Sequence, residues 1–260
     1  MADEERAADV DADPRAFFGR HAAQYAKSEG HKSGADLDMV VRALSPLDGA
    51  ACLDVATGTG FCALALARAG GRVTAVDLTA EMLAETAALA AAAGVDIALV
   101  AGDACRLPLP DLSFDRVTCR RAAHHFDDVG VAVGEAFRVL RPGGLLAVAD
   151  MAPAAAASVF QDDIERMRDP SHRHALTPEQ WRATFEAAGF ERVAIELWHE
   201  RQDFDRWYYP VTDAARRARI EAAMAAAPAA AAEALGLRRE PGKGWSLVKQ
   251  RAVVVGRRPA

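Results

Sequence analysis

The sequence predicts an α/β protein built on a doubly wound, mostly parallel sheet. Short apolar strands alternate with helices between residues 51 and 151, and a glycine-rich turn joins the first strand directly to the first of these helices. Such a repetition buries both faces of a sheet only when the strands run parallel and helices cover them. We expect seven strands, one of them antiparallel, with an N-terminal helical lid and a C-terminal helical insertion near residues 201–244.

The composition excludes several classes of protein. A chain of 260 residues with 51% apolar and 26% charged side chains has the balance of a folded domain. Its net charge of −6 disfavours nucleic acid and anionic membranes as partners, so a small molecule is expected. The four cysteines lack a metal-binding or redox spacing, so we expect reduced thiols and no metal. A homodimer is compatible with the sequence.

Targeting signals are not evident. Residues 1–6 are acidic where a signal peptide would be basic, and the apolar stretches are too short and interrupted for a membrane span. The sequence therefore predicts a cytoplasmic protein without stable membrane insertion.

The amino-terminal region is expected to hold a tail and two helices. Residues 1–13 are acidic and alanine-rich without strong apolar periodicity, which predicts a disordered tail. Apolar residues recur at helical spacing in 14–27, and a second helix is predicted at 35–44. Phe17 and Phe18 are expected to be core residues.

The central region supplies the alternating elements. Gly70 and Gly71 end its first helix, Thr79 is predicted to cap the second, and Gly94 ends that helix. The predicted strands are 51–55, 72–77, 96–100, 114–119 and 145–151, and the helices are 61–69, 79–94 and 129–140.

The last third departs from this rhythm. A helix near 159–167 precedes a polar loop, and Thr177 with Gln180 forms a capping box that starts a helix running to Gly189. Residues 203–235 are predicted to be mainly helical. The remaining strands, 191–199 and 246–256, are expected to pair antiparallel at one side of the sheet.

The glycine turn and two carboxylates predict a nucleoside site. Gly58 and Gly60 allow a tight bend and the close approach of a ligand, and the helix start offers free N–H groups. Asp77, at the tip of the second strand, suits the hydroxyl groups of a ribose, and Asp103, after the third, suits an adenine amino group. These positions lie at the carboxyl ends of adjacent strands, where open α/β sheets bind ligands.

A dinucleotide is the alternative ligand. The spacing of Gly58, Gly60 and Ala63 also fits the relaxed dinucleotide pattern of dehydrogenases. However, Asp54 stands just before the turn, where it would repel a pyrophosphate and suits a cationic group better. After Met151 the sequence shows no pattern typical of a second nucleotide-binding half. A nicotinamide-dependent reductase is thus the less favoured function.

Five segments resemble a known family. They are residues 54–60, 75–83, 102–108, 113–117 and 138–144. In this order and spacing they are similar to the motifs of class I S-adenosylmethionine-dependent methyltransferases, in particular the subgroup of ubiquinone and menaquinone biosynthesis C-methyltransferases. Ala56 stands where the family has its first glycine. The resemblance covers roughly residues 40–155.

The resemblance implies a Rossmann-like fold with S-adenosyl-L-methionine as cofactor. Asp77 would hold the ribose, Asp103 the adenine, and Asp54 with the glycine turn the methionine end. It implies one domain over residues 14–260, with lid helices at 14–45, a cofactor-binding core at 46–155 and an acceptor-side cover at 156–260. The cofactor-binding residues would be Asp54, Ala56, Thr57, Gly58, Gly60, Asp77, Leu78, Met82, Gly102, Asp103, Ala104 and Arg120.

The segment after the fourth strand, residues 119–126, is where the acceptor of the methyl group should approach. His124 or His125 could serve as catalytic base, because an imidazole with a pKa near 6.5 can take a proton from a phenol, enol or activated carbon. We expect at least one of the two to be purely structural.

Three residues are candidate substrate contacts: Tyr25, Arg121 and His172. For Arg120 and Arg121, a solvated position or an ion pair with Asp127 or Asp128 is an equal alternative. The loop around His172 is more simply an internally bonded turn that supports the following helix. The predicted function is methyl transfer from S-adenosylmethionine to carbon or oxygen of a small organic acceptor. A relative that binds this cofactor without methylating is a further alternative.

Overall fold

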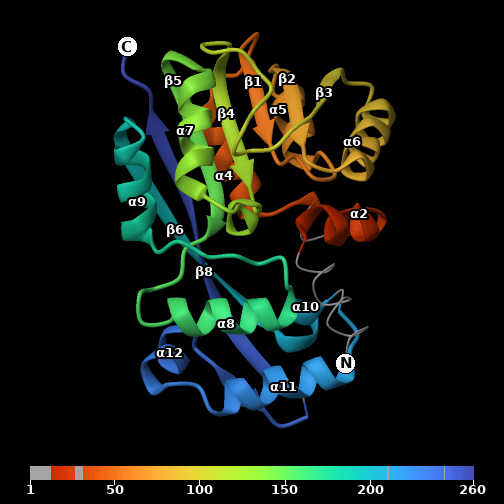
Figure 1. The fold of residues 1–260 in the computed structure, drawn as a ribbon, viewed down its shortest axis with the longest axis vertical. Helices are drawn as coiled ribbons and strands as arrows, with labels where there is room; N and C mark the ends of the chain where they lie inside the picture. Colours follow the sequence, from red (N-terminus) through yellow and green to blue (C-terminus); the bar gives the residue numbers. More distant parts are fainter. Residues whose placement is uncertain (1–12, 27–31, 210, 243) are drawn as a thin grey trace.

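The structure is a computed structural model that describes residues 13–26, 32–209, 211–242 and 244–260. The predicted disordered tail lies outside these residues, except for Asp13, whose side chain caps the first described helix. An eight-stranded sheet runs through the middle of the molecule (Figure 1). Its strands are β1 (Ala51–Val55), β2 (Arg72–Asp77), β3 (Ile97–Ala101), β4 (Phe114–Arg120), β5 (Leu140–Met151), β6 (Glu191–Asp203), β7 (Arg238–Glu240) and β8 (Gly244–Arg257).

The strand order is β3-β2-β1-β4-β5-β8-β6, and β7 pairs with β8 beside this path. Neighbours from β3 to β5 are parallel, whereas β8 is antiparallel to both β5 and β6. The predicted mostly parallel sheet, with one antiparallel strand among seven, is confirmed. The short strand β7 is an eighth that the sequence did not indicate. Because the strand order reverses at β1 and β4, the crevice of the sheet opens at their carboxyl ends.

Helices cover both faces of the sheet, as a doubly wound arrangement requires (Figure 1). Alternate residues of β1 serve two different cores: Cys52 packs into one cluster, and Leu53 and Val55 pack into the other. The first cluster lies under α4 (Ala35–Leu44), α5 (Phe61–Arg68) and α6 (Ala80–Ala93), and the second under α7 (Val129–Val139) and α9 (Pro178–Ala187).

The C-terminal third adds a helical layer at one end of the molecule (Figure 1). A third apolar cluster holds it together, built around Ile164, Phe204, Trp207 and Leu247. Its helices are α8 (Ser158–Arg168), α10 (Phe204–Tyr208), α11 (Ala214–Ala225) and α12 (Ala229–Ala234). Within the described part of the chain, every helix is too short or too polar to traverse a bilayer.

Several predicted boundaries differ from the structure for local reasons. β6 continues to Asp203, because its last residues pair with β8 as far as Ser246. The predicted insertion therefore starts later than residue 201, and its helical part is three short helices, the last of which begins after Pro228. β5 already begins at Leu140, which pairs with Phe114. The capping box at the start of α9 is present as predicted.

The amino-terminal helix α2 (Pro14–Tyr25) packs against α6, near the carboxyl ends of the first strands (Figure 1). Of its two neighbouring phenylalanines, Phe17 is 5% exposed, whereas Phe18 is only half-buried. This position lets α2 form one wall of the crevice that the reversal of strand order creates.

Candidate active site

A cavity of about 730 Å³ lies between the carboxyl ends of the first strands and α2. Eleven of the twelve predicted cofactor-binding residues line it, together with three of the other candidates. The eleven are Asp54, Ala56, Thr57, Gly58, Asp77, Leu78, Met82, Gly102, Asp103, Ala104 and Arg120, and the three are Tyr25, Arg121 and His125. Gly60, His124 and His172 are not among its lining residues.

The glycine turn has three residues in the left-handed region: Ala56 with a φ of 52°, Gly58 with 56° and Gly60 with 85°. A Cβ atom on Gly58 would meet no atom within 4 Å, so its bare backbone faces the open cavity. A Cβ atom on Gly60 would lie 2.6 Å from Cγ2 of Thr86. Gly60 therefore shapes the turn and the packing of α6, while Gly58 borders the ligand space.

Asp77, at the tip of β2, is held in place by three hydrogen bonds. Its Oδ2 accepts from the N–H of Gly58 at 2.8 Å, and its Oδ1 accepts from the N–H and the hydroxyl of Thr79 at 3.0 and 2.8 Å. The hydroxyl of Thr79 therefore does not cap α6 as predicted, because it bonds to this carboxylate instead. A carboxylate offers about four lone-pair positions, so Asp77 can still accept from a ligand.

Asp54, the last acidic residue before the turn, is 1% exposed. The hydroxyl of Thr57 donates to its Oδ2 at 2.6 Å. Burial raises the pKa of Asp54 from its ordinary 3.8 to about 6, although the hydrogen bonds of Thr57 and of the Ala63 N–H counteract this. A cationic group entering the cavity would favour the charged form and lower this pKa again.

Arg120 and Arg121 share one buried carboxylate, that of Asp36 in the first turn of α4. Their Nε atoms lie 2.8 and 2.7 Å from its Oδ2, and their Nη2 atoms lie 3.1 and 3.0 Å from its Oδ1. Burial by itself would raise the pKa of Asp36, but the two guanidinium groups lower it to about 2. The suggested ion pairs with Asp127 or Asp128 are therefore wrong.

The carboxylates suggested for those ion pairs have other partners. Asp127 pairs with Arg173 at 3.2 Å, and Asp128 caps α7 by accepting from the N–H of Val131 at 3.0 Å. The pairing with Asp36 connects α4 to the end of β4 across 84 residues of sequence. No local pattern in the sequence predicts this contact.

The two neighbouring histidines have different surroundings. Nδ1 of His124 lies 2.6 Å from Oδ1 of Asp150, a β5 residue that is 1% exposed. Burial would raise the pKa of Asp150, but His124 lowers it to about 2. His125 instead lines the cavity, where its ring packs edge-on against the ring of Phe18, with 4.8 Å between the ring centroids. Burial and the nearby His124 lower the pKa of His125, so its imidazole is neutral at pH 7.

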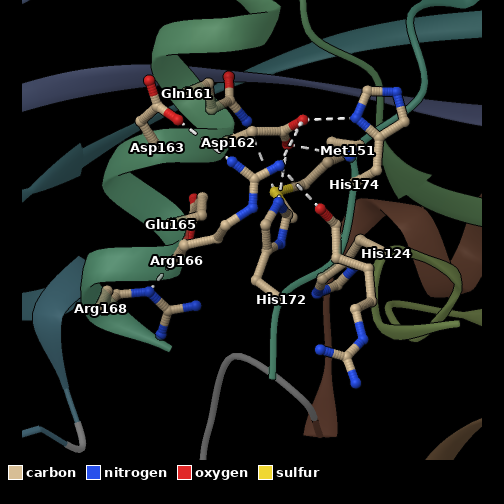
Figure 2. Close-up of polar contacts among 12 residues, drawn as sticks. His124, Met151, Gln161, Asp162, Asp163, Glu165, Arg166, Arg168, His172 and His174 are labelled. Atoms are coloured by element: carbon tan, nitrogen blue, oxygen red, sulfur yellow. Dashed lines mark hydrogen bonds and ion pairs between the residues drawn. The ribbon is translucent and has the colours of Figure 1, made fainter. Parts of the chain in front are cut away.

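His172 lies in an internally bonded loop. Its side chain is buried, and its Nε2 lies 2.7 Å from Oδ1 of Asp162 on α8. Figure 2 shows Asp162 also in contact with His174, whose Nδ1 lies 2.5 Å from Oδ2. The N–H of Ala175 donates to Oδ1 as well, at 3.0 Å. The structure therefore contains the internally bonded turn that we predicted as the simpler alternative for the loop around His172.

Sequence reasoning missed an aromatic wall of the cavity. Phe18, expected in the core, lines the cavity together with Phe61, Phe126 and the predicted Tyr25. Burial and Asp169 raise the pKa of Tyr25, so its hydroxyl is neutral. The signal that could have found Phe18 is its spacing of seven residues from Tyr25, which places both rings on one side of α2.

Comparisons with known proteins agree with this geometry. The sequence profile of the methyltransferase domain matches residues 53–148. The chain is 34% identical over 193 residues to the uncharacterized methyltransferase YcgJ of Bacillus subtilis, which covers 73% of this chain and 76% of YcgJ. The crystal structure of YcgJ matches with a TM-score of 0.81 and 29% identity, over 86% of this chain and 98% of YcgJ.

Two further relatives share a shorter segment. The ubiquinone/menaquinone biosynthesis C-methyltransferase UbiE of Paracoccus denitrificans is 47% identical over 109 residues, 40% of this chain and 44% of that protein. The 27-O-demethylrifamycin SV methyltransferase of Amycolatopsis mediterranei is 32% identical over 149 residues, 55% of each chain. The chain thus spans about half the length of these two relatives. The comparisons give no support to the reductase or to the non-methylating relative. By sequence and by fold, the chain belongs to the S-adenosylmethionine-dependent class I methyltransferases.

Proposed function

We propose that this protein transfers a methyl group from S-adenosylmethionine to a carbon or oxygen nucleophile of a small organic acceptor, with His125 as the base. One observation carries the proposal: a single cavity contains the carboxylates of Asp54, Asp77 and Asp103, from three adjacent strand ends, and also His125. The carboxylates suit the cationic and hydrogen-bond-donating groups of the cofactor. The histidine suits an acceptor that must lose a proton.

The residues of the cavity fit the cofactor in charge and in space. Asp54 is a buried carboxylate whose raised pKa calls for a cation, which the ammonium group of the methionine end would provide. Gly58 leaves its backbone open to the cavity, and Asp77 keeps acceptor capacity for the ribose. Asp103 uses Oδ1 to accept from the N–H of Cys105 at 2.8 Å, so Oδ2 is available to an adenine amino group.

The chain itself has to align the acceptor, exclude water and remove a proton. When bound, S-adenosylmethionine supplies an electrophilic methyl group on a cationic sulfur. The rings of Phe18, Tyr25 and Phe126 form an apolar wall that can hold a flat acceptor and displace water. A neutral His125 can take the proton of an acceptor O–H or C–H as the new bond forms.

The names of two relatives indicate which atoms an acceptor of this kind presents for methylation. UbiE is named a C-methyltransferase, and the Amycolatopsis enzyme acts on an oxygen by its name. Both kinds of nucleophile therefore remain within the proposal. A cytoplasmic location and a homodimer also stay predictions.

Calorimetry and product analysis test the proposal. Titration with S-adenosylmethionine should show binding that Asp77→Ala weakens by about 1–3 kcal/mol, the usual loss for hydrogen bonds to a charged group. Incubation with phenol, enol and quinol acceptors should release S-adenosylhomocysteine, and His125→Gln should abolish release without weakening cofactor binding. Binding of NADH in place of S-adenosylmethionine would overturn the cofactor assignment. Binding without transfer to any acceptor of these classes would overturn the activity.

A further inference from the structure

We propose that Ser171 and Asp169 are positioning residues that hold His125 in one tautomer, with the proton on Nδ1 and the lone pair of Nε2 free for the acceptor. This inference rests on the proposed role of His125 as base. However, the tautomer is a property of the protein alone and can be measured without a substrate.

The direction of the hydrogen bonds follows from the number of hydrogens. Oγ of Ser171 lies 2.5 Å from Oδ1 of Asp169 and 3.1 Å from Nδ1 of His125. A carboxylate can only accept, and a hydroxyl has a single hydrogen. The hydroxyl therefore donates to Asp169, and its oxygen is left to accept. The imidazole must then donate from Nδ1, which leaves Nε2 unprotonated in the neutral ring.

Asp169 is the charged end of this chain of contacts. Its side chain is 1% exposed, and burial would raise its pKa, but the charge of Arg168 and the hydrogen bonds from Ser171 favour the ionised form and the pKa is lowered, so the group is a carboxylate at neutral pH. The same Oδ1 also accepts from the backbone N–H of Ser171 at 3.0 Å. Both donors of Ser171 thus converge on one oxygen, which orients the hydroxyl.

The loop that carries Ser171 is anchored on two sides. Toward α8, the N–H of Asp169 donates to the carbonyl of Glu165 at 2.7 Å, and Asp162 holds His172 at 2.7 Å (Figure 2). Toward the cavity, the N–H of Arg173 donates to the carbonyl of His124 at 2.8 Å. Ser171 itself is fully buried. The hydroxyl therefore stands in place beside His125 before any ligand binds.

The neighbouring histidine gives an internal contrast. His124 contacts a carboxylate directly, with Nδ1 at 2.6 Å from Asp150, and it does not line the cavity. At His125 a neutral hydroxyl stands between the ring and the carboxylate. This hydroxyl determines which ring nitrogen of His125 carries the hydrogen, and it keeps the carboxylate one group away from the ring.

The proton balance of the transfer follows from this arrangement. The bond between the methyl carbon and sulfur breaks with its electron pair left on sulfur, and the acceptor forms the new bond to carbon. The acceptor proton moves to Nε2, and the imidazolium keeps its Nδ1–H on Ser171, near the negative charge of Asp169. Water takes the proton after product release.

Nitrogen-15 NMR of the full chain, with labelled histidines, tests the tautomer without a ligand. The His125 resonances are identified by their loss in His125→Gln. We expect the Nδ1–H form in the wild type and in the control Ser158→Ala, which removes a serine hydroxyl that donates to the carbonyl of Ala155. Ser171→Ala should shift the ring toward the Nε2–H form. The Nε2–H form in the wild type would overturn the inference.

Two further measurements separate positioning from simple structural support. Asp169→Asn keeps an oxygen that can accept from Ser171, so the Nδ1–H form should persist. Asp169→Ala removes this acceptor and frees the hydroxyl to donate to Nδ1, so the Nδ1–H form should decrease, and an unchanged tautomer in Asp169→Ala would remove Asp169 from the relay. With an accepted substrate, Ser171→Ala should lower kcat by roughly tenfold or more with an unchanged KM for the cofactor. Equal loss in kcat and cofactor binding would indicate a structural role instead. The expected tautomer without methyl transfer to any acceptor would support the relay and refute the proposed function.

Discussion

The affinity for S-adenosylmethionine should depend on the charge of Asp54. Burial raises the pKa of this carboxyl from 3.8 to about 6, and the ammonium group of the cofactor favours its charged form. If the cofactor binds only the carboxylate, the apparent affinity falls as the pH drops from 7 through 6. The expected loss between pH 7 and pH 5 is roughly tenfold.

The same linkage sets the stability. The pKa of Asp54 is higher in the folded than in the unfolded protein, so the free energy of unfolding decreases as the pH rises from 3.8 to 6. Above pH 6 this decrease has reached its full size. The difference between 3.8 and about 6 corresponds to about 3 kcal/mol. Because a bound cation offsets this cost, the gain in melting temperature on adding the cofactor should be larger at pH 7 than at pH 5.

Isothermal titration calorimetry in buffers of different ionisation enthalpy measures both effects. Binding at pH 5.5 should release about 0.8 protons from Asp54, and the release from this group should fall to about 0.1 protons at pH 7. The matched control Asp54→Asn should bind more weakly at pH 7 and show no proton release in this range. An affinity that stays constant from pH 5 to pH 7, or the same pH slope in Asp54→Asn, would contradict a role for the Asp54 carboxylate in binding the ammonium group.

Three further predictions concern the glycine turn, the anchoring of α4 and the base. Gly60→Ala should lower the free energy of unfolding by about 2 kcal/mol or more in urea titrations, because its Cβ would meet Thr86 at 2.6 Å. Gly58 also has a left-handed φ but borders open space, so Gly58→Ala should cost only about 1–2 kcal/mol. Asp36→Ala leaves two guanidinium groups without their shared carboxylate and should destabilise the fold by about 3–5 kcal/mol, and a loss below 1 kcal/mol would contradict this. In the wild type this contribution is present above pH 3.8 and is lost as the pH falls toward 2. Because the pKa of His125 is lowered, kcat with an accepted substrate should stay flat from pH 8 down to pH 6, and a fall centred near pH 6.5 would count against a neutral His125.

Much of the cofactor side of the site could be predicted because it depends on local signals and on topology. A strand that runs through Asp54 into a glycine turn, and a carboxylate at the end of the next strand, are visible as short patterns. Parallel strands then bring their carboxyl ends to one edge. Even the sequence's departure at Ala56 has a structural counterpart, since this residue takes the left-handed φ that glycine adopts more easily.

The acceptor side could not be predicted in the same way. The pairing of Asp36 with two arginines spans 84 and 85 residues, and the contact between Ser171 and His125 spans 46. Which of two adjacent histidines lines the cavity depends on where Asp150 lies, and Asp150 belongs to another strand. Neither the helical nor the strand period carries information on such contacts.

Short patterns along the chain are enough to predict the succession of strands and helices, the parallel sheet and the three acidic strand ends, because backbone periodicity and connection rules act over a few residues at a time. Which polar groups meet depends on tertiary packing, as with the carboxylate shared by Arg120 and Arg121 and the hydroxyl that faces His125. Buried polar groups must find partners wherever packing brings them. Those partners come from distant parts of the chain, so their identity exists only once the chain has folded.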